Sequence, residues 1–235
     1  MGPEWFETLE DDIWLPPDEV GAEQAQFIKK ALCLRKGQVV LDAPCGAGRI
    51  AVHLARAGCR VTGMDLRPQF VERARRRFQQ ARLPGRFLVS DLRKVVFPGE
   101  FHGIFNWFGS FGYFSESENA ELVRRYAAAL RKGGRLLIEQ VNRESILRNF
   151  IAERVDGSII TRGYWDWNAQ RLINRRIVNG VDDPRNMSSM RLYTPGHMRG
   201  LFQQAGLIVE NIVDFPDGDR FSRSSRRMVT IGRKL

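Results

Sequence analysis

Residues 37–141 alternate between short apolar runs and amphipathic segments. Short apolar runs predict strands, and apolar residues three and four apart predict helices. The predicted strands are Val39–Asp42, Arg60–Asp65, Arg86–Val89, Gly103–Trp107 and Arg135–Val141. Helices are predicted at about Arg49–Ala57, at Pro68–Arg82 and from Ser115 to Gly133-Gly134. Strands that alternate with helices in this way indicate a doubly wound, mostly parallel sheet.

The pattern changes after residue 152. Residues 153–194 alternate polar and apolar positions over short stretches, which predicts antiparallel strands joined by tight turns. A helix then begins at Thr194-Pro195, and two closing strands follow at Leu207–Phe215 and Arg227–Gly232. We therefore predict an α/β fold. Its seven-stranded sheet carries helices on both faces, and an antiparallel β insertion follows the fifth strand.

Composition and charge narrow the class of protein. The net charge is +10, from 37 Lys and Arg against 27 Asp and Glu. A basic balance is compatible with a nucleic-acid partner. The arginines are nevertheless scattered, and their densest group, within residues 73–77, lies on a helix that we expect to face solvent. We interpret the charge as a solvated surface, so a nucleic-acid partner is allowed but not favoured.

The three cysteines, Cys33, Cys45 and Cys59, form no CxxC pair and no zinc-ligand spacing. Unpaired cysteines without a metal pattern favour a reduced, cytoplasmic protein with no metal site. The first residues are acidic and lack a long apolar run, so we predict neither a signal peptide nor a membrane span.

Residues 39–67, VVLDAPCGAGRIAVHLARAGCRVTGMDLR, combine a strand, a glycine turn, a helix, a second strand and an acidic residue. Glycines let a backbone approach a ligand closely, and the start of the helix presents N–H groups to it. Asp65, at the end of the second strand, is placed to accept hydrogen bonds from a ribose diol. The stretch therefore predicts a nucleoside-containing cofactor.

Asp42 distinguishes two classes of such cofactor. GAGRIA, residues 46–51, matches the G-x-G-x-x-G/A pattern of dinucleotide sites. In those sites the first glycine follows the strand almost directly, beneath the pyrophosphate. Here residues 42–45 intervene, and an anion at Asp42 repels a pyrophosphate but attracts a cationic ligand. S-adenosylmethionine (SAM) carries a sulfonium and an ammonium group, and it fits this charge better.

LDAPCGAGR is similar to the first motif of the class I SAM-dependent methyltransferases, in its Asp-x-x-Cys-Gly-x-Gly form. Later features follow the family's order, with Asp65 after the second strand, Asp91-Leu92 after the third and Asn106 after the fourth. The resemblance covers residues 37–140 and, more loosely, the closing helix and strands. It implies an enzyme of the small-molecule or uncharacterised branch, with SAM as cofactor and S-adenosylhomocysteine as product.

The resemblance also implies a set of cofactor-binding residues. They are Asp42, Ala43, Pro44, Gly46, Gly48, Arg49, Asp65, Leu66, Asp91, Leu92, Asn106 and Trp107. In the family's pattern the first loop lines the methionine and ribose, Asp65 holds the ribose hydroxyls, and Asp91 accepts from the adenine amine. Asn106 lies where the first and fourth strands diverge, which is where such sheets bind ligands. Arg49 is either a helix-surface residue or reaches the cofactor carboxylate.

The aromatic loop that follows the fourth strand, FNWFGSFGYF at residues 105–114, is the expected acceptor site. Some of its rings are expected to be ordinary core, and Trp107 or Phe111 is placed to face the sulfonium. The candidate substrate-pocket residues are Phe108, Phe111 and Tyr113 of this loop, with Trp165 and Tyr193 of the insertion. The loop lacks the Asn/Asp-Pro-Pro-Tyr/Phe motif of DNA and many RNA or protein methyltransferases, which disfavours those acceptors.

Methyl transfer from a sulfonium is an in-line displacement, so the protein mainly aligns the reactants and excludes water. A general base is needed only where the nucleophile must lose a proton. The candidates for it are Tyr113, Glu139 and His197, and the sequence leaves the catalytic residues unassigned.

The predicted function is transfer of a methyl group from SAM to a nucleophilic nitrogen or oxygen of a small molecule. Three alternatives stay open: an RNA or protein acceptor, a non-catalytic SAM- or nucleotide-binding module, and an NAD-dependent oxidoreductase. We expect a single domain with four parts: a tail and helix at 1–36, a cofactor-binding core at 37–152, the insertion at 153–194, and a closing helix with two strands at 195–235. The insertion is either a lid or a homodimer contact.

Overall fold

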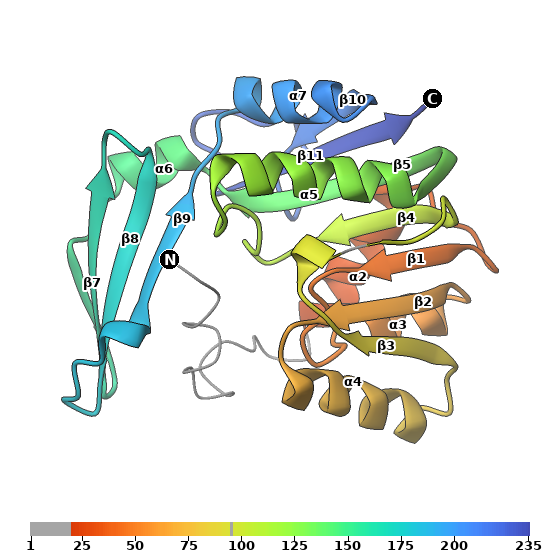
Figure 1. Cartoon of the computed structure of the whole chain (residues 1–235), viewed down its shortest axis with the longest axis horizontal. Coiled ribbons are helices and arrows are strands. Elements are labelled where there is room, and N and C mark those ends of the chain that lie inside the picture. Colours follow the sequence, from red (N-terminus) through yellow and green to blue (C-terminus); the bar gives the residue numbers. More distant parts are fainter. Residues whose placement is uncertain (1–19, 95) are drawn as a thin grey trace.

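Seven strands form the central sheet of the computed structural model, which describes residues 20–94 and 96–235 (Figure 1). Residues 1–19 of the predicted N-terminal tail and helix lie outside the described residues. The strand order is β10 (Leu207–Val213), β11 (Arg227–Lys234), β5 (Leu130–Val141), β4 (Phe101–Asn106), β1 (Val39–Asp42), β2 (Arg60–Asp65) and β3 (Gly85–Val89). The first five strands of the chain, β1, β2, β3, β4 and β5, run parallel to one another. β11 is antiparallel to both of its neighbours, β10 and β5. The predicted fold class is confirmed.

Helices cover both faces of this sheet, as predicted. One face packs against α2 (Val20–Ala31), α3 (Ala51–Arg56) and α4 (Pro68–Gln80), and the other against α5 (Glu116–Ala129) and α7 (Pro195–Gln204). Alternate residues of a strand point to opposite faces. Val40 of β1 accordingly lies in the first core and Leu41 in the second. The α5 start is fixed by the predicted capping box of Ser115 and Glu118.

The end of α5 differs from the prediction. The sequence pattern carries the helix to Gly133-Gly134, but α5 ends at Ala129 and β5 begins at Leu130. Leu130 pairs with Phe101 of β4, and the register then shifts so that Gly103 pairs with Arg135. A Cβ at Gly134 would meet the carbonyl oxygen of Phe101. Pairing with β4 therefore outweighs the local helical preference of these residues.

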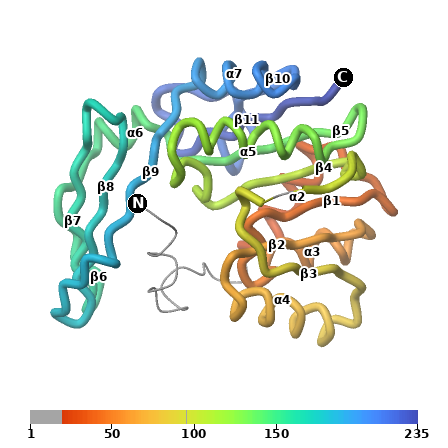
Figure 2. The backbone as a smooth tube through the Cα atoms, viewed as in Figure 1, coloured from red at the N-terminus to blue at the C-terminus, as the bar shows by residue number. Residues whose placement is uncertain are grey.

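The residues after β5 form a second, four-stranded sheet. Its antiparallel strands are β6 (Glu153–Asp156), β7 (Ile159–Asp166), β8 (Arg171–Val178) and β9 (Met187–Arg191). This confirms the predicted antiparallel insertion. Figure 2 traces the chain from β5 through α6 (Arg143–Arg148) into this sheet and back through β9 to α7. Two 3-10 turns complete the described elements, η2 (Leu92–Lys94) and η3 (Pro184–Asn186). In Figure 1 the insertion stands on the side toward which the arrows of β1, β2 and β4 point.

Candidate cofactor and acceptor site

Asp65 joins the first loop to the end of β2. One oxygen of its carboxylate accepts from the backbone N–H of Gly46 at 2.9 Å, and the other accepts from that of Arg67 at 3.0 Å. The side chain is buried, and burial raises its pKa, although those backbone bonds oppose the rise. The predicted glycine loop and the predicted ribose-binding acid are thus one connected structure at the carboxyl edge of the sheet.

Asp42 places a second buried carboxylate beside Asp65. Burial raises the pKa of Asp42 well above its ordinary value, repulsion from Asp65 adds to the rise, and Arg49 opposes it. Within residues 20–94 and 96–235 no hydrogen bond reaches this carboxylate. Two adjacent buried acids create a site that favours a cation. This charge is what a sulfonium or ammonium group requires, so the residues present fit SAM.

Asn106 places a further polar side chain at this edge of the sheet. It is fully buried at the end of β4, and its Nδ2 donates to the carbonyl oxygen of Ala43 at 2.9 Å. The Tyr126 hydroxyl donates to the same oxygen at 3.0 Å. Among the residues that the structure describes, the Asn106 Oδ1 has no partner. Since buried acceptors are normally paired, this oxygen is available to a ligand donor between β1 and β4.

Gly48 packs closely against α4, and the close ligand approach that the sequence suggests for it stays a prediction. Its φ is +73°, and a Cβ added to it would lie 3.0 Å from the Cβ of Ala74 in α4. Any larger side chain would push α4 away from the loop that precedes α3. Gly48 therefore sets the distance between the first loop and its supporting helix.

Arg49 is not a helix-surface residue, so that alternative is wrong. The side chain is buried, and its Nη2 donates to the Oε1 of Gln24 in α2 at 2.7 Å. A Cβ at Gly21 would meet the Arg49 side chain at 3.0 Å, which explains the glycine there. The bond holds α2 against the first loop, and contact with a cofactor carboxylate stays a prediction.

Asp91 is held by an arginine that the sequence reading did not single out. Arg93 donates to the Asp91 carboxylate through its guanidinium at 2.6 Å and its backbone N–H at 2.8 Å. Burial alone would raise the pKa of Asp91, but these bonds outweigh it and lower the pKa. Arg93 also binds Glu118 at 2.9 Å, and neighbouring Leu92 is buried in the core. Asp91 is therefore ionised and oriented, and its predicted contact with adenine stays a prediction.

The aromatic loop divides into core rings and exposed rings, as expected. Trp107 packs edge-on against Phe215, with their centroids 5.2 Å apart, and also contacts Phe27. Phe111 is fully buried against Tyr193. Phe108 is exposed, with a φ of +64°, beneath the guanidinium of Arg227. The proposed contact of Trp107 or Phe111 with a sulfonium stays a prediction.

The three candidate bases differ in what surrounds them. The Glu139 carboxylate is buried, accepts from the Gly109 N–H at 2.8 Å and pairs with Arg227 at 3.0 Å. Burial raises the pKa of Tyr113 to about 12, so its hydroxyl stays protonated at neutral pH. His197 is exposed and closes the capping box of α7 with Thr194. Glu139 and His197 thus both have structural partners.

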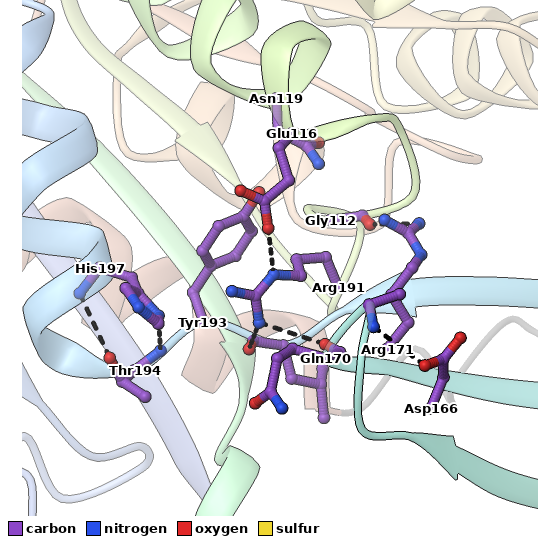
Figure 3. A network of polar contacts seen from close by, with 12 residues as sticks. Gly112, Glu116, Asn119, Asp166, Gln170, Arg171, Arg191, Tyr193, Thr194 and His197 are labelled. Carbon is purple, nitrogen blue, oxygen red and sulfur yellow. Dashed lines mark hydrogen bonds and ion pairs between the residues drawn. The ribbon is translucent and has the colours of Figure 1, made fainter.

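Two arginines of the insertion bind the aromatic loop, a connection absent from the sequence reading (Figure 3). Arg171 donates to the carbonyl oxygens of Gly112 and Phe114, each at 3.1 Å. Arg191 donates from its Nε to Glu116 at 2.6 Å and from its backbone to Gly112 at 2.8 Å. The sequence does not indicate these partners. An arginine in a predicted strand can contact them only once the strand register and the position of the loop are known.

A family model described as "Methyltransferase domain" matches residues 40–134, which hold the first loop, Asp65, Asp91 and Asn106. Over these residues, less than half of the chain, the sequence is similar to methyltransferase domains. Among solved structures, this chain is similar to the CcbJ methyltransferase from Streptomyces caelestis. The TM-score is 0.75 at 20% identity, and the alignment covers 96% of each chain. At that identity the likeness concerns the fold.

Two curated relatives also match this chain. One is a SAM-dependent Diels-Alderase, iccD, from Talaromyces variabilis, with 34% identity over 116 residues, 48% of this chain and 39% of that protein. The other is a ubiquinone biosynthesis O-methyltransferase from Coxiella burnetii, with 22% identity over 170 residues, 69% of this chain and 71% of that protein. The chain thus matches less than half of the first relative's length.

Proposed function

We propose that this protein transfers a methyl group from SAM to a nucleophilic nitrogen or oxygen of a small molecule. The observation that carries the proposal is the buried pair Asp42 and Asp65 beside the unpartnered Oδ1 of Asn106. Two carboxylates and a free acceptor suit a ligand with two cationic groups and a ribose diol. The family match and the name of the ubiquinone relative support a small-molecule acceptor.

Each group at the sheet edge has a distinct task in this proposal. SAM, when bound, supplies a methyl group attached to a positively charged sulfur. Asp65 binds the ribose hydroxyls while it orders the first loop through Gly46. Asp42 and the Asn106 Oδ1 attract and orient the cationic methionine end. The aromatic loop excludes water and aligns the acceptor, which is most of what such a displacement requires of a protein.

The remaining predicted contacts belong to the same proposal. Leu66 and Leu92 flank the adenine ring, and Asp91 accepts from its amine. Ala43, Pro44 and Gly48 shape the methionine side through the backbone of the first loop. No general base is assigned, because an amine nucleophile or a phenolate would need none. If one is used, Tyr113, Glu139 and His197 stay the candidates, and the polar groups of Glu139 and His197 also have structural partners.

A second candidate function keeps the cofactor without methyl transfer. The Diels-Alderase relative is named as SAM-dependent, and its match covers 48% of this chain. A cationic cofactor can stabilise developing charge without giving up its methyl group. This candidate predicts that SAM binds and is recovered unchanged.

Calorimetry with SAM and with NAD, followed by a turnover assay, tests these candidates. We expect SAM binding without NAD binding, and formation of S-adenosylhomocysteine when pooled small molecules are supplied. Absence of SAM binding would refute the proposal. Binding with no S-adenosylhomocysteine from any pool would favour the second candidate, and turnover only with RNA or protein would move the acceptor to that class.

The cellular setting is part of the proposal. No helix in the described part of the chain is long and apolar enough to cross a membrane. Cys33, Cys45 and Cys59 are all free, which supports a reducing, cytoplasmic setting. We infer one methyltransferase domain, in which the insertion acts as a cover for the acceptor. Exposed Tyr164 and Trp167 on the insertion support a homodimer contact as its other role.

A further inference from the structure

β6 is an edge strand of the insertion, and its outer side has no neighbouring strand among the described residues. All of its residues, Glu153–Asp156, are exposed. In Figure 1, β9 lies toward α7 and the central sheet, and β7 lies on the outer side of the insertion. An exposed edge strand offers backbone N–H and C=O groups to another strand. β6 is therefore open to pairing with a second chain.

The backbone hydrogen bonds of β6 determine which of its residues face the open side. The carbonyl oxygen of Ala152, just before β6, accepts from the N–H of Gly163 in β7 at 2.8 Å. In an antiparallel ladder, every second residue directs both of its backbone groups to the same neighbour. The residues two and four positions after Ala152 therefore also bond to β7. Glu153 and Val155 direct their N–H and C=O groups to the open side.

Val155 is the exposed end of an apolar row across the sheet. It pairs with Ile160 of β7, and Ile160 pairs with Ile177 of β8, so the three side chains share one face. Val155 is 64% exposed. Five further exposed large apolar residues lie between residues 150 and 181: Phe150, Ile151, Tyr164, Trp167 and Val181. Exposed apolar side chains that gather in this way mark an interaction surface.

Arg154 and Asp156 flank Val155 and carry opposite charges. Both side chains point to the sheet face opposite to that of Val155. Within residues 20–94 and 96–235, neither side chain has a hydrogen-bond or ion-pair partner. Glu153, by contrast, is already paired with Arg162 at 2.7 Å. Each copy of β6 thus presents one acid and one base whose charges are not yet paired.

Antiparallel pairing of β6 with its own copy is possible in few registers. Two opposed residues must both direct their backbone groups across the gap or both away from it, so the two-fold axis passes beside a residue. An axis at Glu153, Arg154 or Asp156 places a charge against the same charge of the copy, which is destabilising. An axis at Val155 places Arg154 opposite Asp156 in both directions. Charge therefore selects the register centred on Val155.

We propose that β6 pairs antiparallel with β6 of a second copy of this chain, with the two-fold axis at Val155. The two Val155 residues exchange backbone hydrogen bonds, and Arg154 of each copy forms an ion pair with Asp156 of the other. The two apolar rows join into one, and the two four-stranded sheets become continuous. This pairing specifies the homodimer contact proposed above and is independent of the cofactor. It leaves β9, at the opposite edge, bonded to the aromatic loop through Arg191.

Sedimentation equilibrium over a range of protein concentrations tests the inference, and we expect the wild type to be in a monomer–dimer equilibrium. Arg154→Asp places like charges opposite each other twice and should raise the Kd of the dimer by about tenfold or more. Adding Asp156→Arg to that variant restores opposite charges in exchanged positions and should recover most of the affinity. Arg185→Asp, the control, makes the same charge change at an exposed residue beside β9 and should dimerise as the wild type does.

Val155→Pro tests the backbone pairing separately. Proline removes the N–H that faces the open side, and edge strands tolerate proline at such positions. The variant should be monomeric where the wild type dimerises, with an unchanged thermal unfolding midpoint. A wild-type monomer at every concentration would overturn the inference, and so would a dimer of unchanged affinity in Arg154→Asp or Val155→Pro. Because the readout is molecular mass, either failure leaves SAM binding and the proposed function standing.

Discussion

The guanidinium of Arg171 donates a hydrogen bond to the carbonyl oxygen of Gly112 at 3.1 Å. The same oxygen accepts the backbone N–H of Arg191 at 2.8 Å. A strand of the insertion and the loop after β4 are therefore joined at one carbonyl group. The insertion extends the wall formed by the aromatic loop, and a change in either element is transmitted to the other.

Arg171→Met is expected to loosen this connection. The substitution keeps much of the apolar stem but removes the Arg171 donors from the carbonyl oxygens of Gly112, Tyr113 and Phe114. Gly112 keeps the Arg191 N–H and Phe114 keeps the Asn119 Nδ2, so the Tyr113 oxygen loses its donor. An unsatisfied buried group costs about 1–3 kcal/mol, so we expect a loss of about that size in the free energy of unfolding. Hydrogen exchange of residues 109–116 should accelerate while SAM affinity stays within about threefold.

Arg162→Met is the matched control for that experiment. Arg162 lies on the same sheet, but it is exposed, and its ion pair within the described part of the chain is with Glu153. Exposed ion pairs contribute about 0–1 kcal/mol to stability. The Arg162→Met variant should therefore match the wild type in its free energy of unfolding and in the hydrogen exchange of residues 109–116. Equal effects of the two substitutions would show that Arg171 does not hold the loop.

The parts of the fold that depend on local pattern could be predicted from the sequence. Asp42, Asp65, Asp91 and Asn106 follow their strands directly, and parallel strands bring their ends to one edge. Their order was enough to indicate the cofactor. Arg171 could not be assigned, because its partners lie 57–59 residues away and depend on the position of the insertion.

At two positions, Leu130 and Arg49, the local sequence pattern does not predict what the structure shows. Leu130 has a strong helical preference, yet it pairs with Phe101 because the sheet buries it completely. The sequence does not decide whether Arg49 faces solvent or a ligand. Its burial depends on Gln24, which lies 25 residues earlier in α2. In both cases a contact distant in sequence decides the outcome, and periodicity carries no information about such contacts.

Asp65→Ala is expected to weaken SAM binding by at least about 100-fold, or roughly 2.7 kcal/mol. The substitution removes the acceptor for the ribose and also releases the N–H groups of Gly46 and Arg67. Isothermal calorimetry measures the dissociation constant. Glu72→Ala, which removes an exposed acid that pairs with Arg76 on α4, is the control and should bind as the wild type does. Unchanged affinity in Asp65→Ala would refute the placement of the cofactor.

Asp42→Asn is expected to stabilise the protein without ligand and to weaken SAM binding. Burial and Asp65 raise the pKa of Asp42 in the folded state above its unfolded value. The folded protein then binds more protons than the unfolded chain between the two pKa values. Stability therefore falls as pH rises through that window, by about 1.4 kcal/mol for each unit of the shift. The asparagine cannot ionise and avoids this cost.

Urea unfolding at pH 4 and pH 7 measures the effect of Asp42→Asn. The gain in unfolding free energy should be larger at pH 7, where ionisation of the acid in the unfolded wild-type chain favours unfolding, and small at pH 4. SAM affinity of the wild type should rise with pH over the same window, since the ionised carboxylate attracts the cation, and the variant should lose this dependence. A variant less stable than the wild type at pH 7 would contradict the argument.

The Glu139–Arg227 pair provides the last prediction, which separates a structural role of Glu139 from a role as base. Arg227→Met leaves the buried Glu139 carboxylate with its Gly109 bond but without its counter-ion, and should cost about 3 kcal/mol. Glu139→Gln should cost less, and the double variant should recover part of the loss, giving a coupling energy of about 1–3 kcal/mol.

The exposed pair Glu121 and Arg124 is the control, with coupling near zero. If Glu139 were the base, its glutamine variant would abolish turnover at full stability and with wild-type SAM affinity, and the coupling to Arg227 would be absent.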